Sequence, residues 1–243
     1  ILTDQKVDWD LIDILLVLSI TFSLTSLSFV ILDGSIEFLF KINLVKLIKP
    51  ILLNLIQAVL LASLTLLIVK VKYNLTLKHF GLKIVKLSAN IKYGILGGLF
   101  ICILIMVLNN ISHSLISSLF GIKAPTQRVI QLLLDSQNTL LFIAHSFLIV
   151  VIAPITEEIF FRGFIYPYCK GKVGIVKGII LNGIIFGIAH FSYWVFLPTF
   201  FGGIILAWIY EKTHSLYSCI IAHGTWNLII VILVYIIWKI NIF

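Results

Sequence analysis

Apolar runs of about 20 residues recur along the whole chain, separated by shorter polar segments. A helix of about this length crosses the hydrocarbon core of a bilayer, where every backbone hydrogen bond has to be satisfied within the protein. Of the 243 residues, 60% are hydrophobic and 12% are charged, whereas about a quarter of the residues of a soluble domain are charged. The sequence therefore predicts an all-α fold, a polytopic transmembrane helical bundle.

We expect about seven spans, and an eighth helix that lies in the membrane interface over 33–49, where charged residues are interspersed with apolar ones. The predicted spans are 11–32, 51–69, 93–112, 139–169, 178–193, 197–210 and 216–238. The segment before the first span is acidic, so no cleavable signal peptide is expected.

The formal net charge is +8, and the lysines cluster in the loops between apolar runs. Residues 70–92 hold six lysines and no acidic residue, and 170–177 hold three more lysines. This is the positive-inside pattern of membrane proteins rather than a surface for nucleic acid. It predicts that 70–92, 170–177 and 211–215 are cytoplasmic and that 113–138 lies on the opposite side. Three lysines within 33–49 then fall on the wrong side, which either the interfacial helix or a miscounted span would explain.

One apolar span contains an ionisable cluster formed by Glu157, Glu158 and Arg162. Such groups are costly in a bilayer, so they indicate a functional site by default. Glu158 and Arg162 are four residues apart on one helix face and can form an ion pair. Glu157 lies about 100° round the helix from Glu158 and is less easily neutralised by the arginine. The plainer interpretation is a buried ion pair with a spare glutamate near the membrane edge.

Two further polar clusters lie on later spans, His190 in Phe186-Gly-Ile-Ala-His190, and the pair His223 and Asn227. A single histidine in a span is usually a packed, hydrogen-bonded residue. If 139–169 and 178–193 form an antiparallel hairpin, however, Glu157 and His190 both lie about 22–27 Å from its turn. His223 and Asn227 share a helix face and lie about 15–21 Å from a turn on the same side. We therefore predict one buried polar pocket lined by three helices.

The three clusters, Glu157-Glu158-x-x-x-Arg162, Phe186-x-x-x-His190 and His223-x-x-x-Asn227, resemble the motifs of the CAAX protease and bacteriocin-processing family of intramembrane endopeptidases. The resemblance covers about 139–238. It implies a catalytic core there, preceded by N-terminal transmembrane helices over 1–138 with the lysine-rich loop 70–92. It also implies hydrolysis of a peptide bond within the membrane. Eukaryotic members of this family cut prenylated CAAX tails, and bacterial members are linked to peptide maturation and bacteriocin self-immunity.

The high Ile and Lys content suggests a bacterial plasma membrane, so the expected substrate is a membrane-associated peptide or protein. Hydrolysis needs an activated water and donors for the oxyanion. We expect Glu157 to be the general base and His190 to hold the same water. His223 and Asn227 would then donate to the oxyanion, while the Glu158–Arg162 pair anchors the helix.

Alternatives stay open at this point. Glu157, His190 and His223 could instead be three ligands of a Zn²⁺ ion with water in the fourth position. The chain could also be a membrane immunity or scaffold protein without catalytic activity, or a transporter with a proton-linked carboxylate pair. No HExxH motif and no GxSxG motif occurs in the sequence.

Overall fold

The computed structural model describes residues 7–39 and 44–242, and this part of the chain is helical with no strand. Six helices are long and apolar enough to cross a membrane, and a shorter apolar helix is packed among them. The predicted all-α bundle is confirmed, and the chain is a multi-pass membrane protein. In order, the elements are α1 (Leu11–Leu39), α2 (Leu44–Tyr73), η1 (Leu77–Phe80), α3 (Leu87–Phe120), α4 (Arg128–Leu134), α5 (Thr139–Phe147), η2 (Leu148–Ile152), α6 (Ala153–Phe160), η3 (Phe161–Ile165), α7 (Tyr166–Val173), α8 (Ile175–Ile188), α9 (Tyr193–Thr213) and α10 (Leu216–Ile242).

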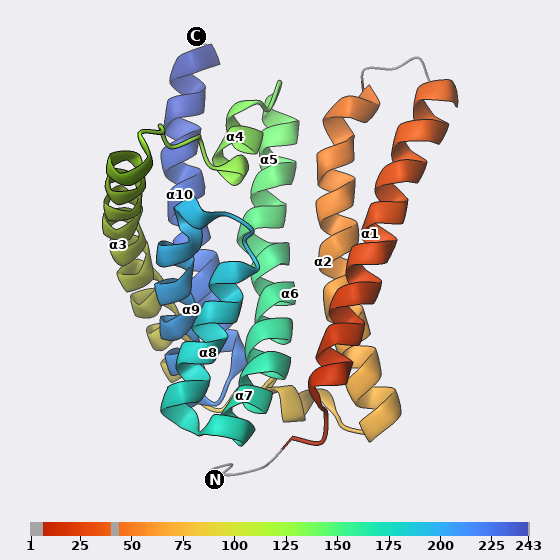
Figure 1. Cartoon of the computed structure of the whole chain (residues 1–243), viewed down its shortest axis with the longest axis vertical. Coiled ribbons are helices and arrows are strands. Elements are labelled where there is room, and N and C mark those ends of the chain that lie inside the picture. Colours follow the sequence, from red (N-terminus) through yellow and green to blue (C-terminus); the bar gives the residue numbers. More distant parts are fainter. Residues whose placement is uncertain (1–6, 40–43, 243) are drawn as a thin grey trace.

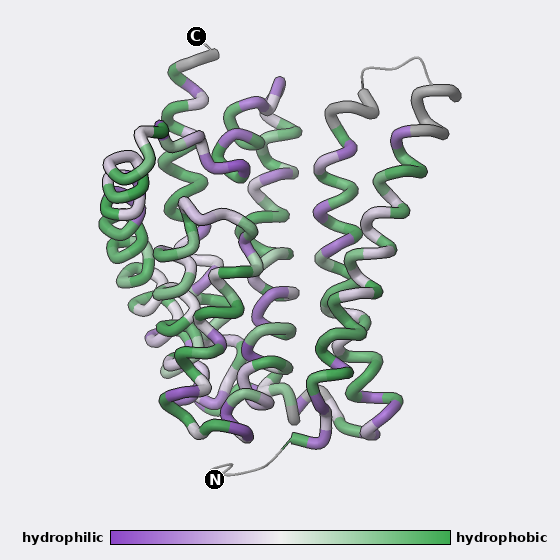
Figure 2. Tube along the Cα trace, viewed as in Figure 1, coloured by the Kyte–Doolittle hydropathy of each residue, from purple (hydrophilic) through white to green (hydrophobic). Residues whose placement is uncertain are grey.

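Elements α5 to α7 form one continuous rod from Thr139 to Val173 in the middle of the bundle (Figure 1). Helices α3, α8, α9 and α10 pack on one side of this rod, and the α1–α2 hairpin lies on the other side (Figure 1). Helix α2 makes the main contact of the hairpin with the rod. The indole Nε1 of Trp9, just before α1, also donates a hydrogen bond to Phe164 O at 2.8 Å. Figure 2 shows that the long helices are predominantly hydrophobic, as expected for lipid-facing surfaces.

Small residues allow the helices around the rod to approach closely. A Cβ atom on Gly203 of α9 would lie 3.0 Å from the Cα atom of Gly183 of α8, so the two glycines face each other directly. On α3, Gly94 and Gly98 are similarly covered by α10, where a Cβ on Gly98 would lie 2.5 Å from Ala222 O. Such small-residue contacts are the usual means by which membrane helices pack tightly.

The loops with most lysines meet at one end of the bundle, as the charge pattern predicts. Leu216 N, after the α9–α10 turn, donates to Gly81 O at 2.8 Å, and Lys170 of α7 pairs with Glu211 of α9 at 2.7 Å. The turn between α7 and α8 is also at this end (Figure 1). We call this the lysine-rich end; that it is cytoplasmic stays a prediction.

Two details of the predicted span pattern are wrong. Residues 33–39 prolong α1 and 44–49 begin α2, so no separate interfacial helix occupies the described parts of 33–49; residues 40–43 lie outside the described residues. The predicted span 178–193 is instead α8, whose 14 residues are about 21 Å long, which is too short to cross the bilayer. The α8–α9 turn over 189–192 therefore lies part-way up the bundle (Figure 1). Irregular backbone at membrane depth is tolerated where protein buries it or where it lines a watery cavity.

Candidate active site

Two π-helical turns bracket the short helix α6, which carries both glutamates. Ahead of α6, Ala153 N–H bonds back five residues to Leu148 O in η2. Beyond α6, Tyr166 N–H bonds to Phe161 O in η3 in the same way. A proline follows each of these donors, Pro154 and Pro167, and proline has no N–H with which to continue the hydrogen-bond ladder. Single π turns within α-helices are frequent at functional sites.

The first π turn leaves one carbonyl without a helical donor. Ala153 N–H is committed to Leu148 O, and the next donor in the series would be Pro154, so Ile149 O has no N–H partner from its own helix. Asn227 of α10 fills this place, because its Nδ2 donates to Ile149 O at 2.7 Å. Asn227 thus connects α10 to the π turn ahead of α6. Only its second amide hydrogen remains free for the predicted hydrogen bond to the oxyanion.

This arrangement predicts the effect of a double-mutant cycle. Asn227→Leu should lower the free energy of unfolding by about 1–3 kcal/mol, since Ile149 O then loses its donor. In a Pro154→Ala background, residue 154 supplies an N–H, and the same substitution should cost measurably less. Thermal unfolding in detergent, compared across the four proteins, measures the difference.

The matched control is Asn182→Leu, because Asn182 Nδ2 donates to Phe161 O, in the other π turn, at 2.9 Å. Its cost should be the same in the wild-type protein and in the Pro154→Ala background. An equal cost of Asn227→Leu in both backgrounds would show that Asn227 does not compensate for the proline.

The predicted ion pair between Glu158 and Arg162 is present and fully buried. Arg162 Nη1 lies 2.7 Å from Glu158 Oε1, and both side chains are 0% exposed. The same Glu158 oxygen lies 2.9 Å from His223 Nδ1 of α10, and Arg162 Nη2 donates to Gly203 O of α9 at 3.2 Å. Three helices therefore meet on one carboxylate–guanidinium pair, which is what a buried charge needs in order to be tolerated.

Glu157 has a different environment from its neighbour. Its side chain is half-buried, and its Oε2 is buried with no hydrogen-bond partner among the described residues. The arginine is held by Glu158 and not by Glu157, as the helical spacing predicts. A buried carboxylate oxygen that has no protein donor requires a water molecule or a ligand group as its partner.

His190 lies at the end of α8 and is exposed, unlike His223. Its Nδ1 is 2.8 Å from Phe186 O, a carbonyl that can only accept, so Nδ1 carries the hydrogen and Nε2 is free to bind water in the neutral ring. The Phe186 ring contacts both imidazoles, with centroid distances of 4.9 Å to His190 and 5.9 Å to His223. Arg162 Cζ also lies 4.4 Å from the centroid of this ring. Phe186 is therefore the apolar centre around which the charged groups gather.

Whether Glu157, His190 and His223 bind zinc stays a prediction. Within 7–39 and 44–242, no group of three His, Cys, Asp or Glu side chains could hold one metal ion. The part of the motif that the structure brings into direct contact is Glu158, Arg162 and His223, with His190 against the shared Phe186.

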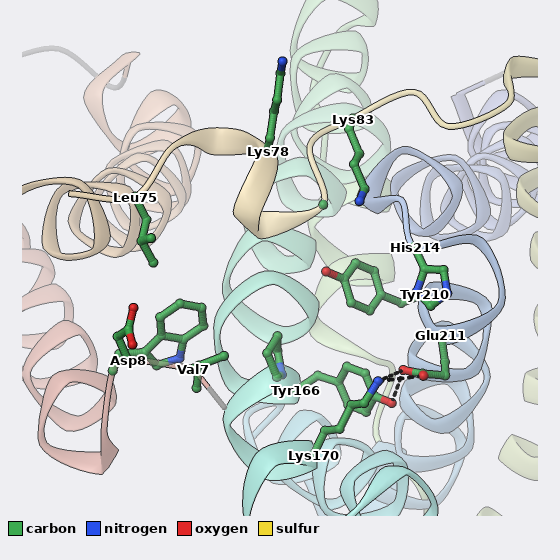
Figure 3. A pocket seen from close by; sticks show the side chains of 13 residues that line it. Val7, Asp8, Leu75, Lys78, Lys83, Tyr166, Lys170, Tyr210, Glu211 and His214 are labelled. Atoms are coloured by element: carbon green, nitrogen blue, oxygen red, sulfur yellow. Dashed lines mark hydrogen bonds and ion pairs between the residues drawn. The ribbon is translucent and has the colours of Figure 1, made fainter. Parts of the chain in front are cut away.

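Sequence reasoning missed Asn182, Tyr166 and Glu211, which support the site. Asn182 is fully buried and four residues before Phe186, so its polar side chain in an apolar helix was a usable signal. At the lysine-rich end, Glu211 of α9 accepts hydrogen bonds from Tyr166 OH at 2.8 Å and from Lys170 at 2.7 Å (Figure 3). This network holds α7, directly beyond the second π turn, against α9; no local sequence pattern predicts it.

Fold and site together define a multi-pass membrane protein with a charged, hydrogen-bonded centre built from three adjacent helices. Residues 139–229 match the family model of the type II CAAX prenyl endopeptidase Rce1-like proteins. This segment of the chain is therefore similar to the Rce1-like proteins.

The chain is also similar to a curated protein, UPF0177 protein YxdF of Lactococcus lactis subsp. lactis (strain IL1403). The two are 24% identical over 95 residues, which make up 39% of this chain and 52% of the relative. The chain thus spans about half the length of that relative. No solved structure matches the chain.

Proposed function

We propose that the protein is an intramembrane endopeptidase that hydrolyses a peptide bond in a membrane-associated peptide or protein. The observation that carries the proposal is Glu157, a carboxylate with one buried and unpartnered oxygen, next to a fully buried Glu158–Arg162 pair. Its place within the segment that matches a protease family supports the same assignment. The catalytic core is 139–238, the helices of 1–138 support it, and the protein resides in a bacterial plasma membrane.

In this mechanism Glu157 takes a proton from the attacking water, and the free Nε2 of His190 accepts a hydrogen bond from the same water. His223 donates Nδ1–H to Glu158, so its Nε2 donates to an oxyanion only when the ring carries a hydrogen on both nitrogens. The second amide hydrogen of Asn227 is the other donor to the oxyanion. The proton held by Glu157 then passes to the leaving amine, which completes hydrolysis.

The test compares the membrane peptides of cells that carry either the wild-type protein or Glu157→Gln. A cleavage product present with the wild type and absent with Glu157→Gln identifies both the reaction and its substrate. If the two peptide profiles are the same although a cellular phenotype depends on the protein, the protein acts by binding and is not a protease. Substrate flux in proteoliposomes would instead indicate transport.

A metal-free reaction is the version we propose, because the described residues contain no group of three His, Cys, Asp or Glu side chains that could hold one metal ion. We expect purified protein to keep its full rate after treatment with EDTA or 1,10-phenanthroline. The measurement is cleavage of the identified peptide, together with elemental analysis of the same sample. Loss of activity that returns on addition of Zn²⁺ would overturn the metal-free version and favour zinc hydrolysis.

A further inference from the structure

A groove lies on the lipid-facing side of the bundle, between α3, α8 and α9, and none of the residues that line it is a glutamate of α6. Its volume is about 580 Å³. Its walls are almost entirely apolar, and they include Leu96 and Phe100 of α3, Ile179 of α8, and Ile204 and Ile205 of α9. At its floor α3 and α9 pack tightly, since a Cβ on Gly97 would be only 2.5 Å from Ile209 Cδ1.

One end of this groove is positively charged. Lys92 of α3 lines it, and it is the only charged residue that does so within the described parts of the chain. Trp208 lines the same groove, and Lys212 Nζ lies 5.9 Å from the Trp208 ring centroid. Both lysines are exposed, and among the described residues neither forms an ion pair with a carboxylate. They lie near the start of α3 and the end of α9, that is, at the lysine-rich end.

The length of the groove indicates which kind of molecule could occupy it. Along α3 the groove runs from Lys92 to Phe100, which is about 12 Å and less than half of a membrane crossing. It is therefore too short for a further transmembrane helix and has the proportions of a lipid chain. Tyr93 and Trp208 beside the lysines are the aromatic residues typical of the level of the lipid headgroups. Basic pockets between membrane helices bind anionic headgroups.

We propose that this groove binds one anionic phospholipid, with an acyl chain along Leu96 and Phe100 and the phosphate between Lys92 and Lys212. The site is independent of the protease assignment. It abuts the catalytic helices, because Ile204 of the groove also contacts Gly183, and the neighbouring Gly203 O accepts the hydrogen bond from Arg162. A bound lipid would close the outer side of the α8–α9 contact that positions the buried ion pair.

The experiment is native mass spectrometry of the full chain in detergent micelles, titrated with phosphatidylglycerol or with phosphatidylcholine of the same acyl chains. Phosphatidylglycerol should bind about fivefold or more tightly than phosphatidylcholine. Lys92→Gln should weaken phosphatidylglycerol binding by about fivefold and leave phosphatidylcholine unchanged. Lys86→Gln, an exposed lysine outside the groove, is the matched control and should have no effect.

Leu96→Trp should reduce the binding of both lipids by filling the groove, whereas Leu99→Trp, also on an exposed position of α3 but outside the groove, should not. Equal binding of the two lipids, or equal behaviour of the two tryptophan variants, would overturn the proposal. Should Leu96→Trp lower the thermal stability of the protein, the comparison of Lys92→Gln with Lys86→Gln decides alone.

Discussion

Glu157→Gln is expected to lower the rate of peptide cleavage by a factor of about 10²–10⁴, the usual contribution of a positioned general base. Glutamine has nearly the same shape as glutamate but cannot take the proton from water. Because the Glu157 side chain forms no hydrogen bond or ion pair with the described residues, its free energy of unfolding should change by no more than about 0.5 kcal/mol. Cleavage kinetics of purified protein and thermal unfolding in the same detergent measure the two effects.

The control for this prediction is Asp135→Asn, which removes an exposed acid between α4 and α5. It should leave the cleavage rate unchanged. Turnover by Glu157→Gln at the wild-type rate would refute the assignment of the base, and a large loss of stability would show that Glu157 has a structural partner.

Arg162→Met, unlike Glu157→Gln, is expected to destabilise the protein strongly. Its free energy of unfolding should fall by about 3–5 kcal/mol. The substitution leaves the Glu158 carboxylate at 0% exposure without its cation, and it also removes the hydrogen bond to Gly203 O. Cleavage falls as well, because Glu158 holds His223 in place. The measurement is unfolding of the purified protein in mixed detergent and SDS.

The double variant Glu158→Leu/Arg162→Met is the informative comparison. Removing both side chains leaves no buried carboxylate without its guanidinium partner, so the double variant should be more stable than Arg162→Met alone. A double variant that loses the sum of the two single losses would contradict this account, since it would mean that the two side chains stabilise the fold independently.

Much of the fold follows from the apolar runs, because each run long enough to span a bilayer became a long helix. The exception is α8, whose apolar sequence gives no signal of its end at Ile188. That end depends on tertiary structure, since the next helix begins at Tyr193, part-way along the bundle (Figure 1). The proposed interfacial helix is wrong because the described charged residues of this segment, Asp33, Glu37, Lys46 and Lys49, lie at the ends of two long helices.

The contacts of the site were predictable where they depend on local helical spacing and not where they depend on how distant helices pack. The i, i+4 spacing of Glu158 and Arg162 is a local rule, and it gave the correct pair. The bond from His223 to Glu158 joins residues 65 positions apart, so it depends on how α10 packs against α6. The hydrogen bond from Asn227 to Ile149 O was even harder to predict from the sequence. It depends on a π turn in another helix, which only the hydrogen-bond pattern of the structure reveals.

The two π turns affect the direction in which the side chains of the α5–α7 rod project. Each one accommodates an extra residue, which rotates every later side chain by about 100° relative to a regular α-helix. The directions in which the two glutamates project are therefore set by the number of residues upstream of them as much as by their identity. Gain or loss of a single residue within Leu148–Ile152 would redirect Glu157 and Glu158 without altering any of the motif residues.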